Sequence, residues 1–162
     1  MVWSEKTEVK KGCIGENYAK QFLEEKGFIL YAPVTNGAHK IDYFAHSGKD
    51  KRVIAVDAKT KKRMAKYCET GIDTHQLIHY REIMEKHKMP VFLYFVDDFE
   101  ECIYGQWLEL LGDGIERKNV TVWHLSKMVF IRSLGKNEVD ELKQYSKKDN
   151  YDYSKVVKFF NP

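Results

Sequence analysis

The chain has 162 residues, of which 43% are hydrophobic and 14% aromatic, so it is long and apolar enough to bury a core without disulfides or structural metal. These proportions exclude a disordered tail, no apolar run approaches the length of a membrane span, and the mixed-charge N-terminus lacks the apolar stretch of a secretory signal. The net charge of +3 neither requires nor excludes a nucleic-acid partner.

Taken in chain order, the first half of the sequence predicts one helix and three strands. Apolar side chains recur at helical spacing over residues 9–26, and Gly27 stands where a left-handed C-cap is expected. Apolar segments bounded by turn signals then predict strands over residues 28–34, 40–46 and 52–59.

The second half alternates helix and strand. After a loop from about residue 60 to 72, a helix over residues 73–88 begins with Asp73 or Thr74 as N-cap, and Pro90 ends it. Further strands and a short final helix follow over 90–98, 102–110, 120–125 and 138–146. We therefore expect one α/β (α+β) domain over residues 1–162, with a central mixed sheet flanked by helices. Its core spans about 9–98 and a C-terminal elaboration spans about 99–162.

The cysteines are odd in number and show no CxxC spacing: Cys13, Cys68 and Cys102. This pattern favours a reduced, intracellular protein, and we expect a cytoplasmic one. No glycine-rich phosphate loop follows a strand, so we expect no nucleotide cofactor.

The third predicted strand, RVIAVDAK, is apolar until it reaches Asp57 and Lys59. Because side chains alternate along a strand, these two residues share a face. Two charged groups on an otherwise apolar face are costly if they are buried without partners. They either reach water at the strand end or face a metal ion and a substrate.

Asp42 interrupts the neighbouring strand, KIDYFAH, which a short polar turn joins to the strand of Asp57. In an antiparallel hairpin with Ser47 opposite Arg52, Asp42 lies directly opposite Asp57, with Cβ atoms roughly 5 Å apart. Carboxylates that close repel unless a cation lies between them, and a hard divalent ion such as Mg²⁺ fits the pair. A shift of one residue would place the aspartates on opposite faces, so the metal hypothesis predicts this register.

Two stretches of the chain are rich in cations. The first follows Asp57 and contains Lys59, Lys61, Lys62, Arg63 and Lys66. The second, KQYSKKDNYDYSKVVK, also carries tyrosines. Interleaved cations and aromatic rings can hold phosphates and stack on bases, and the alternative for both stretches is a solvated surface. Near a metal, the ammonium of Lys59 would polarise a water or neutralise a phosphate, and the cations after it would grip flanking phosphates.

The residues in this order resemble the PD-(D/E)xK nuclease superfamily over about residues 12–96. Asp42 followed by Asp57-Ala58-Lys59 resembles its acidic core motif. The segment GCIGENYAKQFLEEKGFIL resembles the start of its Holliday-junction-resolvase-like members, in which a helix glutamate, here Glu16, joins the acidic cluster. Gln76 to Tyr80 reads as Q-x-x-x-Y, which is similar to a motif of RecB-like nucleases. The chain departs from the pattern in having Ile41 before Asp42 rather than proline, and aspartate at position 57 rather than the commoner glutamate.

The resemblance implies a restriction-endonuclease-like fold and a Mg²⁺-dependent DNA endonuclease, with Mn²⁺ as a substitute. Products would carry a 5′-phosphate and a 3′-hydroxyl, and a resolvase would act as a homodimer on DNA, with no membrane partner. The implied roles are metal binding by Asp42, Asp57, the carbonyl of Ala58 and, as an auxiliary ligand, Glu16. Lys59 would be catalytic and Gln76 would orient the water or a phosphate. The residues expected to contact nucleic acid are Lys61, Lys62, Arg63, Lys66 and Tyr80.

Several of these residues have simpler alternatives. Glu16 stands four residues before Lys20, a spacing typical of a surface ion pair, and Gln76 stands in D-x-x-Q capping-box spacing. Tyr80 fits core packing equally well. His75 and His79 are spaced as in some zinc sites, but surface histidines are the more common reading.

Two other functions fit the same fold. A nucleic-acid-binding module would keep a structural or vestigial acidic site without turnover. An RNA-processing nuclease would use the same chemistry to cut RNA instead of DNA.

Overall fold

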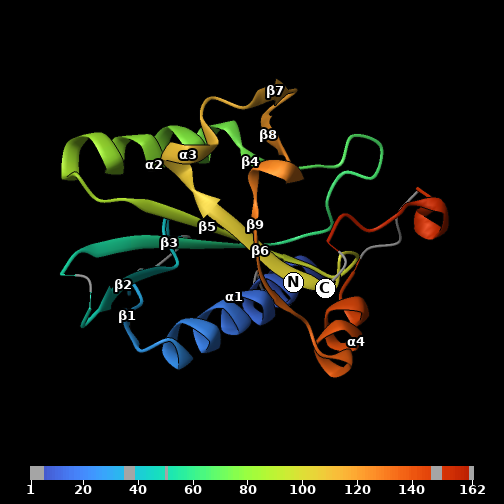
Figure 1. Ribbon diagram of the computed structural model, residues 1–162, viewed down its shortest axis with the longest axis horizontal. Helices are drawn as coiled ribbons and strands as arrows, with labels where there is room; N and C mark the ends of the chain where they lie inside the picture. The colour runs from blue at the N-terminus through green and yellow to red at the C-terminus, as the bar shows by residue number, and fades with distance from the viewer. Residues whose placement is uncertain (1–5, 35–38, 50, 147–150, 161–162) are drawn as a thin grey trace.

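The structure is a computed structural model that describes residues 6–34, 39–49, 51–146 and 151–160. Its centre is a mixed six-stranded sheet in the order β1-β2-β3-β5-β6-β9 (Figure 1). Strands β3 and β5 run parallel, and every other neighbouring pair is antiparallel. The strands are β1 (Phe28–Tyr31), β2 (Tyr43–Ser47), β3 (Val53–Thr60), β5 (Val91–Asp97), β6 (Cys102–Trp107) and β9 (Val129–Ser133).

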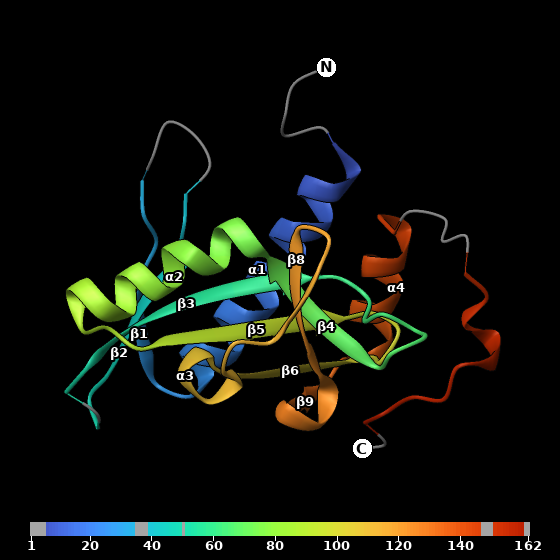
Figure 2. The same cartoon turned by 90° about the horizontal axis from the view of Figure 1, so that it is seen from above.

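Helices cover both faces of this sheet. The α-helices are α1 (Thr7–Glu25), α2 (Thr74–His87), α3 (Leu108–Leu111) and α4 (Lys136–Gln144), and two 3₁₀ turns are η2 (Leu125–Lys127) and η3 (Tyr153–Lys155). Helices α1 and α4 lie on one face, and α2 lies on the other beside a small antiparallel sheet (Figures 1 and 2). The strands of that sheet, in spatial order, are β4 (Glu69–Asp73), β8 (Val120–His124) and β7 (Ile115–Arg117).

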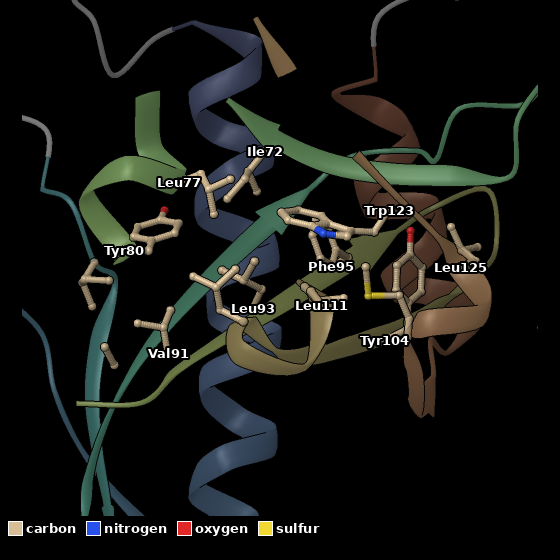
Figure 3. Close-up of a cluster of buried hydrophobic side chains, with 14 of the residues drawn as sticks. Ile72, Leu77, Tyr80, Val91, Leu93, Phe95, Tyr104, Leu111, Trp123 and Leu125 are labelled. Carbon is tan, nitrogen blue, oxygen red and sulfur yellow. The ribbon is translucent and has the colours of Figure 1, made fainter. Parts of the chain in front are cut away.

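Strand β3 contributes alternate side chains to two separate cores. Ile54, Val56 and Ala58 pack into the core beneath α1 and α4, while Ala55 packs into the core beneath α2. Figure 3 shows this second core, in which Tyr80 of α2 lies near the aliphatic side chains of β5. By the same alternation, Asp57 and Lys59 point to the α2 face of the sheet.

The predicted fold class is confirmed: a central mixed sheet flanked by helices. The differences concern short strands that pair over long sequence distances. The predicted loop 60–72 contains β4, which pairs with β8 some fifty positions later. The strand predicted over 102–110 ends at Trp107, where α3 begins. Strands β7 and β9 carry no clear period-two pattern and were not expected. Among the described residues, no helix is long and apolar enough to span a bilayer.

Candidate metal centre

The hairpin of β2 and β3 sets the position of the two aspartates. Tyr43 pairs with Val56 and Phe44 with Ala55, so continuing the register by one residue places Asp42 directly opposite Asp57. The predicted register is therefore confirmed. The backbone N–H of Ala58 donates to Asp42 Oδ2 at 2.7 Å, which fixes this carboxylate beside β3 although Asp42 itself precedes β2.

Asp57 is 2% exposed and has two polar neighbours on the α2 face. The Lys59 ammonium lies 2.8 Å from Asp57 Oδ2. The Tyr80 hydroxyl is close enough that it and the Asp57 carboxylate shift each other's pKa. The ion pair with Lys59 is therefore the closest polar contact of this buried carboxylate, and the Tyr80 hydroxyl lies buried beside it.

Glu16 reaches the same region from α1, on the other side of the sheet. Burial raises the pKa of Glu16, the charge of Asp57 raises it further, and His39 and Lys59 act in the opposite direction. Helix α1 lies against β3 here because residue 15 is glycine: a Cβ at Gly15 would stand 1.8 Å from Thr60 Oγ1. The alternative pairing of Glu16 with Lys20 is not formed, since Lys20 lies 3.9 Å from Glu24 instead.

In the acidic cluster, which we define as Glu16, Asp42 and Asp57, the Lys59 ammonium offsets only part of the negative charge. Burial raises the pKa of Asp42 to about 6, and the Glu16 carboxylate adds to this effect against a hydrogen bond from Ala58. Burial raises the pKa of Asp57 to about 7, although the Lys59 ammonium opposes the shift. Carboxylates whose pKa values are raised by burial and by one another favour the binding of a cation.

The donor atoms suit a hard divalent cation. The acidic cluster and the Ala58 carbonyl supply oxygen only, which favours Mg²⁺ or Mn²⁺ over zinc. As the side chains stand, no three His, Cys, Asp or Glu residues of the described part of the chain converge closely enough to ligate an ion together. The residues therefore fit an ion held mainly by the aspartate pair.

His39 belongs to this region but was missed by the sequence analysis. Its Nε2 lies 3.6 Å from Asp42 Oδ1, and its ring lowers the pKa of Glu16. The signal that could have identified it is its place three residues before Asp42, in the segment that enters the hairpin.

Gln76 lies in the first turn of α2 and is half-buried. It stands one helical turn before Tyr80, so both residues face the same side of the helix. The capping-box alternative is not supported, because Asp73 is the N-cap residue but its side chain makes no capping hydrogen bond. A role for Gln76 at the site stays a prediction.

For two residues, Tyr80 and Arg63, the expected contact with nucleic acid is contradicted by their burial. Tyr80 is 1% exposed and packs in the core. Arg63 is 2% exposed, and its guanidinium pairs with Glu100 and donates to the carbonyls of Met64, Ala65 and Val157. Neither side chain can reach a phosphate or a base. The spacing of the cations in the sequence does not indicate that Arg63 has buried partners.

The remaining cations of the first basic stretch lie nearer the surface. Lys61 is half-buried, and burial lowers its pKa to about 8. The Lys62 ammonium lies 5.1 Å from the centre of the Tyr153 ring, so the two basic stretches meet in space. Lys66 is exposed. Residues 147–150 of the second stretch lie outside the described residues.

The raised pKa of Asp57 predicts how stability changes with pH in the metal-free protein. Between about pH 4 and pH 7 the folded state keeps a proton that the unfolded state releases, so the free energy of unfolding falls as pH rises. The fall should amount to about 2–4 kcal/mol, and Asp57→Asn should remove most of it.

The measurement is urea unfolding in EDTA at pH 4.5 and pH 8. Asp113→Asn is the matched control, because Asp113 is fully exposed and pairs with Arg81 at the surface. Equal pH dependence in the wild type and in Asp57→Asn would contradict the assignment.

Comparison with known proteins finds a solved structure with a similar fold. No family model and no curated protein matches the chain. The structure is similar to that of Hjc from Archaeoglobus fulgidus, a Holliday junction resolvase from an archaeal hyperthermophile, with a TM-score of 0.54 and 12% sequence identity. The match covers 72% of this chain and 90% of that one. At this identity, the similarity shows a shared resolvase-like fold.

Proposed function

We propose that this protein is a divalent-metal-dependent DNA endonuclease that hydrolyses phosphodiester bonds in branched or otherwise structured DNA. The observation that carries the proposal is the register that sets Asp42 opposite Asp57, with Lys59 beside them. The similarity to a protein named as a Holliday junction resolvase favours a branched substrate. Symmetric cutting of a four-way junction needs two sites, so we expect a homodimer.

The ion would be held by Asp42, Asp57 and the carbonyl of Ala58, with Glu16 as an auxiliary ligand. A bound Mg²⁺ or Mn²⁺ would supply the positive charge that offsets these carboxylates and the scissile phosphate. The hairpin holds the aspartates in place before substrate binds, because the backbone N–H of Ala58 anchors Asp42 and the strand core anchors Asp57.

Lys59 has the position of a catalytic residue. Its ammonium lies 2.8 Å from Asp57 Oδ2 and its side chain is partly exposed, so it can also reach a water or a phosphate oxygen at the surface of the site. From there it would orient the attacking water and stabilise the negative charge that develops on the phosphate. Gln76 would orient the same water or phosphate from α2.

The test is a cleavage assay on four-way-junction, duplex, plasmid and single-stranded DNA, with RNA as a further substrate, in Mg²⁺, Mn²⁺ or EDTA. We expect metal-dependent cleavage with preference for the junction, and loss of cleavage in Asp42→Asn and Asp57→Asn. Asp113→Asn should cut like the wild type. Cleavage that persists in EDTA or in both aspartate variants would refute the proposal.

Two outcomes of the same assay point to other functions. Binding without cleavage of any substrate in any metal would support a binding module with a vestigial acidic site. Cleavage confined to RNA would support an RNA-processing nuclease.

A further inference from the structure

We propose that Lys40, His75 and His79 form a phosphate-binding site beside the acidic cluster, which holds a backbone phosphate of the bound nucleic acid close to the phosphate that is cut. We call these residues the Lys40 cluster. The inference rests on the proposed function, because it specifies how the same site would hold its substrate.

The Lys40 cluster joins two distant segments of the chain. His75 and His79 stand four residues apart on α2, and their ring centres lie 4.6 Å apart. Lys40 comes from the segment that enters the β2–β3 hairpin, and its Nζ lies 3.4 Å from His79 Nδ1. Three nitrogen-bearing side chains thus meet at the surface between α2 and the start of the hairpin.

The charge of the Lys40 cluster suits an anion. The ammonium of Lys40 and a ring N–H of each histidine are hydrogen-bond donors. Within the part of the chain that the structure describes, Glu82 is the carboxylate that contacts the cluster, at 3.6 Å from His79 Nδ1. Glu82 is shared with Lys86, whose Nζ lies 3.5 Å away. Because Glu82 is shared with Lys86, the Lys40 ammonium is the charge of the cluster that a phosphate would neutralise.

The place of the Lys40 cluster matches the spacing of a nucleic-acid backbone. Lys40 stands two residues before Asp42, so their Cα atoms lie at most about 7 Å apart. Consecutive phosphates of one strand are about 3.4 Å apart along the axis of duplex DNA and farther apart in space, so this distance corresponds to about one nucleotide step. On α2, His79 directly precedes Tyr80, whose hydroxyl lies beside Asp57. Both segments of the cluster thus border the acidic cluster.

A zinc site is the other reading of two histidines at this spacing. Among the described residues, no third ligand joins them in a group of His, Cys, Asp or Glu that could hold an ion. The lysine at 3.4 Å from His79 Nδ1 also opposes a cation there. An anion is therefore the ligand that the cluster favours.

The experiment measures binding without cleavage. Labelled four-way-junction DNA is titrated by fluorescence anisotropy in EDTA at several salt concentrations, with all proteins in an Asp57→Asn background. We expect Lys40→Ala and the double variant His75→Ala/His79→Ala each to weaken binding about 5- to 10-fold, and Lys40→Ala to reduce the slope of log K against log salt by about 1. Lys86→Ala, an exposed cation farther along α2, should stay within about twofold.

In the Asp57-containing protein, Lys40→Ala should raise KM with kcat nearly unchanged, since the phosphate it holds is bound equally in the ground and transition states. An unchanged salt slope in Lys40→Ala, or a loss of affinity equal to that of Lys86→Ala, would overturn the inference. So would an effect of the histidine variants that appears only with added Zn²⁺.

These outcomes separate the two proposals. A wild-type protein that binds DNA with this Lys40 dependence but never cuts would refute the proposed function and support the Lys40 cluster. Cleavage with no dependence on Lys40 would refute the cluster alone. No binding to any nucleic acid would refute both.

Discussion

Replacing Lys59 with alanine is expected to lower the kcat of DNA cleavage by about 10²–10³-fold while leaving metal binding intact. A charged donor aimed at the reacting phosphate is worth this much in comparable sites. The ammonium lies 2.8 Å from Asp57 Oδ2 and competes there with a divalent cation, so its removal should tighten Mn²⁺ binding slightly. Single-turnover cleavage and a Mn²⁺ titration measure the two quantities separately.

Asp57→Asn provides the contrast, because it should lose cleavage and Mn²⁺ binding together. Lys20→Ala is the matched control: Lys20 is a partly exposed lysine on α1 that pairs only loosely with Glu24, and both quantities should match the wild type. If Lys59→Ala lost Mn²⁺ binding as fully as Asp57→Asn, the separate role given to the lysine would be wrong.

Replacing Arg63 with alanine is expected to lower the free energy of unfolding by about 3–5 kcal/mol, because it leaves a buried carboxylate without its cation. Glu100 is 1% exposed and its remaining partners are the backbone N–H groups of Phe159 and Phe160. The Arg63 guanidinium also donates to the carbonyl of Val157 at 2.7 Å. Its loss should therefore detach the C-terminal segment from the loop that follows β3.

Equilibrium unfolding in urea measures the loss, and hydrogen exchange at Phe159 and Phe160 should report the detachment. Arg81→Ala is the control, since Arg81 pairs with Asp113 at the surface, where the two side chains are 42% and 98% exposed, and its loss should leave the free energy of unfolding nearly unchanged. The salt slope of DNA binding should not change in Arg63→Ala. If the Arg63→Ala protein were as stable as the wild type and showed a reduced salt slope of DNA binding, Arg63 would contact DNA and its structural role would be wrong.

The sequence was sufficient to predict the register of Asp42 and Asp57 because the relevant constraints are local. The alternation of β3 and the short turn before it determine that Asp42 lies opposite Asp57. The boundaries of α1, α2 and α4 followed from side-chain periodicity and from capping and stop signals, whereas α3 was not predicted. These signals act over a few residues, so they survive without knowledge of the tertiary structure.

Other features depend on residues far apart in the chain. The burial of Arg63 requires Glu100 and Val157, and no local pattern separates such an arginine from the exposed lysines around it. Strand β4 exists only because β8 pairs with it. The contact of His79 with Lys40 joins a helix to a hairpin across 39 positions. The spacing of the two histidines is therefore visible in the sequence, but the contact with Lys40 is not.

The most direct test of the acidic cluster is a crystal structure of the protein with Mn²⁺, read by anomalous scattering. We expect one strong anomalous peak between the carboxylates of Asp42 and Asp57, within coordination distance of their oxygens. Asp42→Asn crystals should lack the peak. Absence of any peak from wild-type crystals at millimolar Mn²⁺, or a peak bound elsewhere with this site empty, would contradict the account.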